Sequence, residues 1–325
     1  MIKVFREDNG HLVSSTHENN DFSAVAENVW IDISSPTLDT LKELSKLTSL
    51  PLDFLVSALD SEESARADYD EGNTLIVLDT PVERIQSEKK ETKPLFETIP
   101  FVIIYNQSYY VTLHQEESNL INQLVAKSKL LEPHKHVRMT LHLLFTLAQN
   151  FIASLKRIDA RSRAIESRLH SSMKNKELFD LMELNKMLVY FSTALNADKA
   201  VSERLKKTAD YKKYEDDYDL MEDVQVELNQ AIEMCSIYRD ILAGMMDAFA
   251  SIISNNLNIV MKVLAILTIV LSIPTLIASF YGMNINSGMP LQDTPNSFWI
   301  IIAISAFFAL IGGVALIVFE KRHKR

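Results

Sequence analysis

Residues 263–284 read VLAILTIVLSIPTLIASFYGMN, and the first 18 of them, Val263–Phe280, carry no charged side chain. A second uncharged stretch, FWIIIAISAFFALIGGVALIVF, fills residues 298–319. A helix needs roughly 20 apolar residues to cross a bilayer core of ~30 Å. The second stretch meets this length, and the first meets it when the neighbouring uncharged residues join it. The sequence therefore predicts two membrane-spanning helices.

The charges around these two stretches predict the orientation of the chain in the membrane. The connection between them, Tyr281–Ser297, contains no Lys or Arg, whereas Lys262 precedes the first stretch and EKRHKR follows the second. Positive residues favour the cytoplasmic side. We therefore expect a multi-pass protein of the cell membrane with a short outer loop and both termini in the cytoplasm.

Upstream of the first stretch the chain is suited to unusually long helices. Residues 134–273 contain no proline and only one glycine, Gly244. We expect helices over about 134–170 and 175–206, and a third from near Asp217 without a break until Pro274, on the order of 85 Å at ~1.5 Å per residue. The third helix carries apolar residues at alternating spacings of three and four, which is typical of bundles and coiled coils. This seam consists of Met221, Val224, Leu228, Ala231, Cys235, Tyr238, Leu242, Met245, Phe249, Ile252, Asn256 and Ile259.

The first 130 residues have an α+β pattern. Trp30–Ser34 and Asn73–Pro81 have strand composition. Residues 99–114 read IPFVIIYNQSYYVTLH, which predicts a hairpin that turns at Asn106-Gln107. Helical spacing occurs in 38–47, 51–59 and 117–131. Strands and helices do not alternate regularly, so we do not expect a doubly wound fold.

Composition excludes several classes of function. Residues 1–261 hold 28 Lys and Arg against 41 Asp and Glu, a net charge of −13 that is unsuited to binding nucleic acid. A single cysteine, Cys235, excludes a disulfide framework. Only seven glycines are present, and they form no phosphate-binding loop. No arrangement of Ser, His and Asp suggests hydrolysis, so we expect no enzyme and no organic cofactor.

A polar stripe inside the first uncharged stretch is the main functional indication. Its members are Thr268, Ser272, Thr275 and Ser279. At ~100° per residue they fall within about 60° of one another. The stripe continues towards the N-terminus through Met261, Asn258, Ser254, Ser251 and Asp247. A polar face in lipid must point at protein or at water.

Two explanations of this stripe remain open. Ser and Thr often join membrane helices, so the stripe could be a packing surface. Alternatively, several copies of the helix surround a water-filled path, which the length of the stripe favours. Met261 and Leu264 would then form an apolar collar that closes the path by losing its water.

The end of the first stretch resembles a known family. YGMN, Tyr281–Asn284, ends the first of two C-terminal spans, and NIVMKVL (258–264) and RDILAGMMD (239–247) precede it. In these features the chain resembles the CorA family of magnesium channels, clearly over residues 215–325 and in architecture elsewhere. The resemblance implies a homopentamer that imports Mg²⁺, with Co²⁺ or Ni²⁺ as further substrates, through a pore lined by the first span.

We expect the selectivity filter at Tyr281, Gly282, Met283 and Asn284. Mg²⁺ sheds its water shell reluctantly. A ring of Asn284 carbonyl oxygens would accept hydrogen bonds from those waters without adding charge that traps the ion. Gly282 would allow the turn where the helix ends, Tyr281 would anchor at the membrane interface, and Met283 would pack.

The sequence departs from the family in two places. Many members have MPEL in the outer loop, whereas residues 289–292 here read MPLQ, so Asp293 would have to supply any negative ring that attracts cations. Members also bind regulatory Mg²⁺ between an acid of the stalk helix and an acid of the neighbouring domain. Asp223 matches the first position, but Val56 stands near the second, with Asp60, Glu62 and Glu63 just beyond.

Together these features predict a mainly α chain in three parts: an α+β cytoplasmic domain (1–133), a cytoplasmic helical bundle with a coiled-coil stalk (134–262), and a two-span pore region with a basic tail (263–325). We expect a homo-oligomer in the lipid bilayer with Mg²⁺ as both transported and regulatory ion. A Zn²⁺ transporter of the same architecture and a membrane-anchored coiled-coil scaffold that transports nothing are the alternatives.

Overall fold

The structure is a computed structural model that describes residues 1–8, 11–17, 22, 25–88, 91–116, 119–126, 131–171, 175–208, 211, 216–283, 290–291 and 294–323. The chain forms two compact units, Met1–Met246 and Asp247–Arg325. The three-part division at residues 133 and 262 stays a prediction. Each unit is described below by itself.

A sheet forms the centre of the first unit. Among the described residues it has seven strands in the order β2-β1-β3-β7-β6-β5-β4, and neighbours are antiparallel except for the parallel pair β3 and β7. The strands are β1 (Ile2–Asp8), β2 (His11–His17), β3 (Val29–Ser34), β4 (Arg66–Asp70), β5 (Asn73–Glu88), β6 (Glu91–Tyr105) and β7 (Tyr109–His114). This mostly antiparallel sheet with helices on its faces confirms the α+β prediction.

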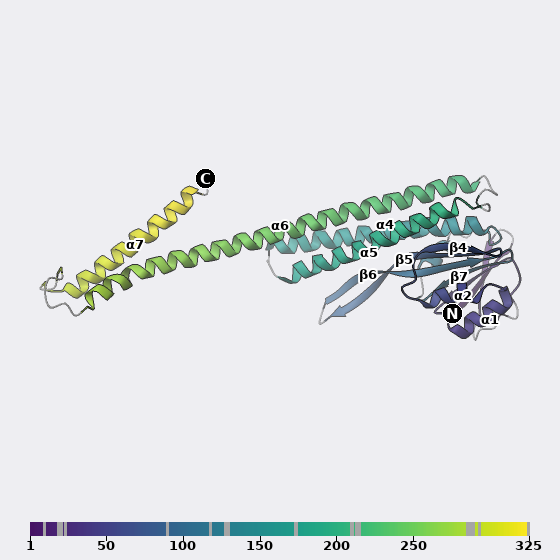
Figure 1. Cartoon of the computed structure of the whole chain (residues 1–325), viewed down its shortest axis with the longest axis horizontal. Helices are drawn as coiled ribbons and strands as arrows, with labels where there is room; N and C mark the ends of the chain where they lie inside the picture. Colours follow the sequence, from purple (N-terminus) through teal and green to yellow (C-terminus); the bar gives the residue numbers. More distant parts are fainter. Residues whose placement is uncertain are drawn as a thin grey trace. The chain divides into compact units, whose positions relative to one another are not determined.

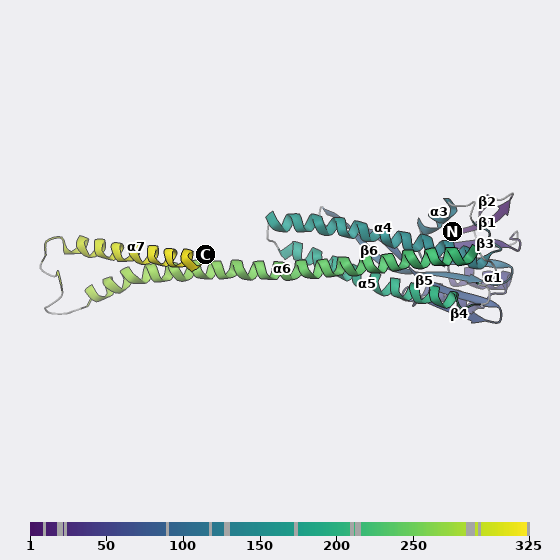
Figure 2. The ribbon, with the colours of Figure 1, turned by 90° about the horizontal axis from the view of Figure 1, so that it is seen from above.

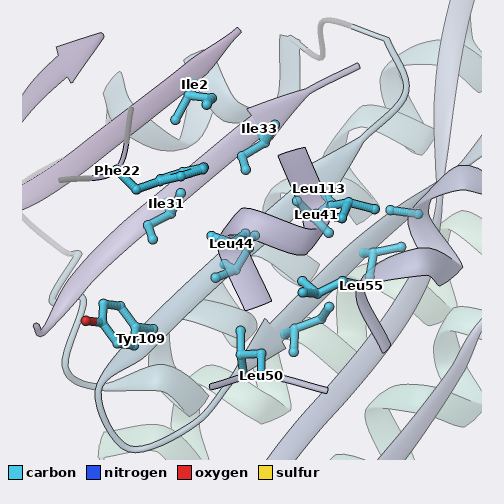
Figure 3. Close-up of a cluster of buried hydrophobic side chains, with 14 of the residues drawn as sticks. Ile2, Phe22, Ile31, Ile33, Leu41, Leu44, Leu50, Leu55, Tyr109 and Leu113 are labelled. Carbon is cyan, nitrogen blue, oxygen red and sulfur yellow. The ribbon is translucent and has the colours of Figure 1, made fainter. Parts of the chain in front are cut away.

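One face of the sheet is covered by short helices, α1 (Leu38–Thr48) and α2 (Leu52–Val56), and a 3₁₀ turn follows at Ser57–Leu59. Side chains alternate between the faces of a strand. Ile31 and Ile33 of β3 therefore point to the same side, where they join Leu113 in a buried apolar cluster with residues of α1 and α2 (Figure 3). Burial of these side chains holds the helices on the sheet.

The opposite face is covered by α4 (His136–Ser171) and α5 (Asn175–Leu205), and α3 (Asn119–Ala126) packs against α4. The phenol of Tyr110 on β7 lies 3.1 Å from the hydroxyl of Thr140 on α4. Phe96 on β6 meets Phe191 on α5 edge to face, with ring centroids 6.3 Å apart. The first unit is thus a sheet between two layers of helices.

The long helix α6 (Asp216–Tyr281) begins in this bundle, where it lies beside α4 and α5 (Figures 1 and 2). The thiol of Cys235 donates to the carbonyl of Leu188 on α5 at 3.2 Å, and the hydroxyl of Ser162 on α4 donates to the sulfur of Met245 at 3.7 Å. The seam residues Met221, Val224, Leu228, Ala231, Cys235 and Leu242 are at most 1% exposed. The prediction of bundle packing is confirmed for this part of the seam, where helices of the same chain supply the contacts, whereas Asn256 and Ile259 at the far end of the seam are exposed.

The second unit contains the apolar part of α6 and a further helix, α7 (Ser297–His323). Both helices are long and apolar enough to cross a membrane, and almost none of either apolar stretch is buried within the chain. A core helix of a soluble protein would be covered by its neighbours. The two predicted membrane helices are therefore present, and α6 continues beyond Pro274 to Tyr281.

The predicted hairpin across Asn106 is confirmed, because β6 and β7 pair antiparallel from Tyr105–Tyr110 to Phe101–His114. Three strands were not predicted, β1, β2 and β4, because their composition is mixed and polar. The strand predicted to end at Pro81 is β5, which continues to Glu88. β4 pairs with β5 only as far as Val77, so Pro81 lies on an edge strand, where its missing N–H is tolerated.

Candidate functional site

The four hydroxyl residues of the predicted stripe all lie exposed on α6. An open groove of about 580 Å³ runs along them; it is lined by Thr268, Leu271, Ser272, Thr275, Leu276, Ser279 and Phe280. The residues therefore share one side of the helix, as the spacing predicts. That they line a pathway for ions is a separate prediction, considered below.

The hydroxyl protons of three stripe residues already form hydrogen bonds within α6. Thr268 donates to the carbonyl of Leu264 at 2.8 Å, Ser272 to that of Thr268 at 2.6 Å, and Thr275 to that of Leu271 at 2.9 Å. A hydroxyl carries one donor and two acceptor lone pairs. Each of these groups consequently presents acceptors, but no free proton, to whatever occupies the groove.

The stripe residues nearer the N-terminus are also exposed on α6, namely Asp247, Ser251, Ser254, Asn258, Met261 and Leu264. Met261 and Leu264 are 56% and 55% exposed within the single chain. Large apolar side chains at this exposure need a partner in the membrane, either lipid or another copy. The chain by itself does not bring any of these residues together across a pathway.

The C-terminal end of α6 is closed by hydrogen bonds of Gly282. Its N–H donates to the carbonyl of Ala278 at 2.9 Å and approaches that of Ser279 at 3.2 Å. A Cβ built on Gly282 would lie 3.3 Å from the carbonyl oxygen of Ala278, so a side chain fits there only with a shift. The hydroxyl of Tyr281 donates to the carbonyl of Pro290 at 2.9 Å, which ties the helix end to the loop.

Of the other predicted outer residues, Met283 is 53% exposed. Asn284 and Asp293 lie outside the described residues. Their roles therefore rest on the sequence alone.

The acidic start of α6 divides into a buried group and an exposed one. Asp217 has no exposed side-chain surface and accepts a hydrogen bond of 2.7 Å from Nε of Arg138 on α4. Asp219, Glu222 and Asp223 are exposed. Among the described residues no three His, Cys, Asp or Glu side chains are grouped so as to hold a metal ion. A site at Asp223 would need groups from elsewhere.

The acids that follow Val56 are partly engaged within the chain. The carboxylate of Asp60 accepts the backbone N–H of Glu62 at 2.9 Å. Glu63 forms an ion pair with Arg66, whose Nε also lies 2.7 Å from Asp68. Val56 itself is 36% exposed on α2. Glu63 thus has a partner cation within the chain, whereas the side chains of Asp60 and Glu62 are exposed.

A buried polar network that the sequence did not indicate joins β3 to β7. Asp32 lies 3.0 Å from Nε2 of His114 and accepts a hydrogen bond of 2.7 Å from Thr112. Thr112 in turn accepts one of 2.9 Å from the indole of Trp30. Burial lowers the pKa of His114, but the hydrogen bond and charge of Asp32 outweigh it and the net pKa is raised. The network links the two strands of this parallel pair.

Two further carboxyl groups meet where α5 lies on the sheet. Asp198 is fully buried and its Oδ1 accepts a hydrogen bond of 2.9 Å from the backbone N–H of Asp79 on β5. Its Oδ2 has no hydrogen-bond partner among the described residues. Burial raises the pKa of Asp198 well above its usual range and that of Asp79 to about 6.

The shift of Asp198 predicts a contribution to stability that falls as pH rises. Because the folded state binds the proton on Asp198 more tightly than the unfolded chain, this contribution to the free energy of unfolding is greatest below the ordinary pKa of 3.8 and falls as pH rises towards the folded pKa. Asp198→Asn keeps the acceptor for the Asp79 N–H and removes the titration. We expect its thermal midpoint at about pH 7 to exceed that of the wild type.

Thermal unfolding of the full chain between about pH 4 and pH 8 measures this effect. Asp39→Asn is the control, because the Asp39 side chain is 86% exposed. The Asp198→Asn curve should be flatter than both the wild-type and the Asp39→Asn curves. Three parallel curves would show that Asp198 does not titrate differently in the folded and unfolded states.

Comparisons with known proteins agree with this architecture. The sequence profile of the family described as CorA-like Mg2+ transporter protein matches residues 25–322. The cobalt/magnesium transport protein CorA of Methanocaldococcus jannaschii is 26% identical over 288 residues, which cover 87% of this chain and 88% of that protein.

Solved structures share the fold. The complete structure of the CorA magnesium transporter from Methanocaldococcus jannaschii aligns with a TM-score of 0.79 and 24% identity over 96% of each chain. The full-length CmaX protein aligns with a TM-score of 0.68 and 16% identity, covering 97% of this chain and 96% of that one. With a profile that matches nearly its whole length, this chain belongs to the CorA-like Mg2+ transporter family, whose members move divalent cations across membranes and are not enzymes.

Proposed function

We propose that this chain forms a homopentameric channel of the cell membrane that imports Mg²⁺, and also Co²⁺ or Ni²⁺, along the stripe of α6. The observation that carries the proposal is a line of exposed hydroxyls on an otherwise apolar helix of membrane length. Two spans cannot enclose a pore, so several copies are required. A ring of α6 helices turns each stripe residue into a ring of identical groups.

The hydrogen bonds of the stripe suit a hydrated cation. Because Thr268, Ser272 and Thr275 donate to their own helix, their lone pairs face outward. The waters around Mg²⁺ are hydrogen-bond donors, and the ion releases them reluctantly. A path lined by acceptors can therefore carry the ion with its shell. Asn284 would add amide oxygens at the outer mouth, and Asp293 would attract cations in the loop.

The same arrangement suggests how the pathway closes and how the chain is oriented in the membrane. Asp247 would lie at the cytoplasmic mouth, and the collar of Met261 and Leu264 would close by losing its water. Lys262 and the basic tail favour the cytoplasmic side, so both termini would be in the cytoplasm. No organic cofactor is needed, because the ion moves without chemical change.

Uptake into sealed vesicles that contain the purified protein tests this function. Mg²⁺, Co²⁺, Ni²⁺ and Zn²⁺ are compared at equal concentration, with protein-free vesicles as the control. The proposal expects uptake of Mg²⁺, Co²⁺ and Ni²⁺ above background. Selective uptake of Zn²⁺ would favour the zinc transporter, and the absence of all uptake from an assembled oligomer would favour the scaffold.

We further propose that cytoplasmic Mg²⁺ closes the channel by binding between subunits at Asp223. The first 261 residues carry a net charge of −13, so neighbouring copies repel one another until a cation bridges them. A shift from 1:99 to 99:1 requires ~5.5 kcal/mol of differential binding. Several carboxylate sites together supply this energy, whereas a single surface pair, at ~0–1 kcal/mol, does not.

Limited proteolysis tests this regulation. Mg²⁺ is expected to protect the cytoplasmic unit of the wild-type oligomer from protease, because bridged subunits open less often. Asp223→Ala should lose most of this protection. Glu233→Ala is the matched control, since Glu233 is another exposed acid on α6. Equal protection of Asp223→Ala and wild type would rule out Asp223 as the sensor.

A further inference from the structure

The contact between α7 and α6 in the second unit is unusually close at two glycines. A Cβ built on Gly312 would lie 3.1 Å from Cδ1 of Ile273, and one built on Gly313 would lie 3.3 Å from Cγ2 of Val270. Both distances are shorter than ordinary van der Waals contact. The two helices therefore approach as near as these side chains permit, and no residue larger than glycine fits without a shift. Figure 2 shows α7 beside the last part of α6.

This contact lies on the back of the hydroxyl stripe. At ~100° per residue, Val270 lies about 170° and Ile273 about 130° from the middle of the stripe around the helix axis. Their exposure agrees, because both are half-buried while Thr268, Ser272 and Thr275 are exposed. Along the axis the contact is level with Ser272. α7 thus supports α6 from behind at the height where its stripe faces the groove.

We propose that Gly312 and Gly313 are positioning residues that determine how far the hydroxyl stripe of α6 reaches into the ion pathway. The inference rests on the proposed function, since it requires a ring of α6 helices. Lipid gives no hydrophobic drive for helix association, so close packing determines the separation of the spans. A methyl group inserted behind α6 moves the helix towards the pathway or tilts it, and the ring repeats this shift in every copy.

A second substitution at the same contact should compensate for the first. Gly312→Ala places a methyl group against Cδ1 of Ile273, and Ile273→Val removes that atom. The double variant should therefore regain the native separation. Gly244 offers a matched control, because a Cβ built there meets nothing within 4 Å. All three substitutions change the chain by a single methyl group at each position.

The experiment measures Mg²⁺ uptake into vesicles by the full-length wild type, Gly312→Ala, Ile273→Val, Gly312→Ala with Ile273→Val, and Gly244→Ala. Oligomer size by light scattering and the thermal midpoint are recorded for each. Overpacking of this kind is expected to lower the maximal uptake per assembled oligomer about fivefold in Gly312→Ala. The Mg²⁺ concentration at half-maximal uptake should not change, and the double variant should return to the wild-type rate.

Three outcomes would overturn the inference while leaving the channel intact: wild-type uptake by Gly312→Ala, no recovery in the double variant, or a loss that merely follows a loss of assembled oligomer. The last would show that the glycines serve assembly alone. Failure of the wild type itself to take up any of the four ions would instead refute the proposed function, and the inference with it.

Discussion

Asn284→Ala is expected to reduce Mg²⁺ uptake to the background of protein-free vesicles while the oligomer keeps its size. The amide oxygens of a ring of Asn284 side chains would accept hydrogen bonds from the waters of the entering ion, and alanine offers no acceptor. Mg²⁺ releases its water shell reluctantly, so it would meet the filter as a hydrated ion. Loss of this contact would therefore weaken binding of the hydrated ion at the filter. A fluorescent Mg²⁺ indicator sealed inside the vesicles measures the rate of uptake.

Asn286→Ala is the matched control, since Asn286 carries the same side chain two residues further along the same loop. It should transport at a rate close to that of the wild type. If Asn284→Ala also transports normally, the filter is not at this position. If both variants fail equally, the loop as a whole, rather than the Asn284 amide, is required.

Arg138→Ala is expected to lower the stability of the first unit strongly. The guanidinium of Arg138 is 14% exposed and pairs at 2.7 Å with Asp217, whose side chain is completely buried. Oδ2 of Asp217 already has no hydrogen-bond partner among the described residues. Removing the arginine leaves a buried carboxylate without its cation, which costs ~3–5 kcal/mol of the free energy of unfolding.

Chemical denaturation of the detergent-solubilised chain measures this loss. Arg163→Ala is the control, because Arg163 is 73% exposed and pairs with Asp159 on its own helix, a kind of contact that contributes ~0–1 kcal/mol. Arg138→Met combined with Asp217→Leu should recover most of the stability, since both charges then leave the interior. If Arg138→Ala is as stable as Arg163→Ala, water must reach the Asp217 carboxylate when the arginine is removed.

Local patterns were sufficient for the elements that depend on neighbouring residues. The uncharged stretches at 263–280 and 298–319 predicted two membrane helices, and the spacing of Thr268 to Ser279 predicted their shared face. The hairpin at Asn106 followed from two β-rich runs beside a turn. β2 was not predicted as a strand because its residues, HLVSSTH, are polar enough to resemble a loop. It is a strand because β1 pairs with it along its full length.

The acidic start of α6 shows what local sequence patterns cannot predict, namely which acid is buried and which is exposed. Asp217 and Asp223 stand in one run of similar residues, and nothing in that run separates them. The fold does, because Arg138 of α4 meets Asp217 and leaves Asp223 exposed. The same holds for Asp198 and Asp79, which are 119 residues apart along the chain and meet only where α5 lies on β5.

Three features follow from the sequence alone: the membrane helices, the polar stripe and the family resemblance at YGMN. Each of them depends on local hydropathy, helical periodicity or a short motif within one continuous segment. The tertiary structure was needed to show that α4 and α5 of the same chain cover the first part of the heptad seam of α6, and that Gly312 and Gly313 lie against Ile273 and Val270. Such contacts depend on the register between segments far apart in the chain. Periodicity indicates which face of a helix is covered but not which residues cover it, because many partners satisfy the same apolar spacing and only packing selects one.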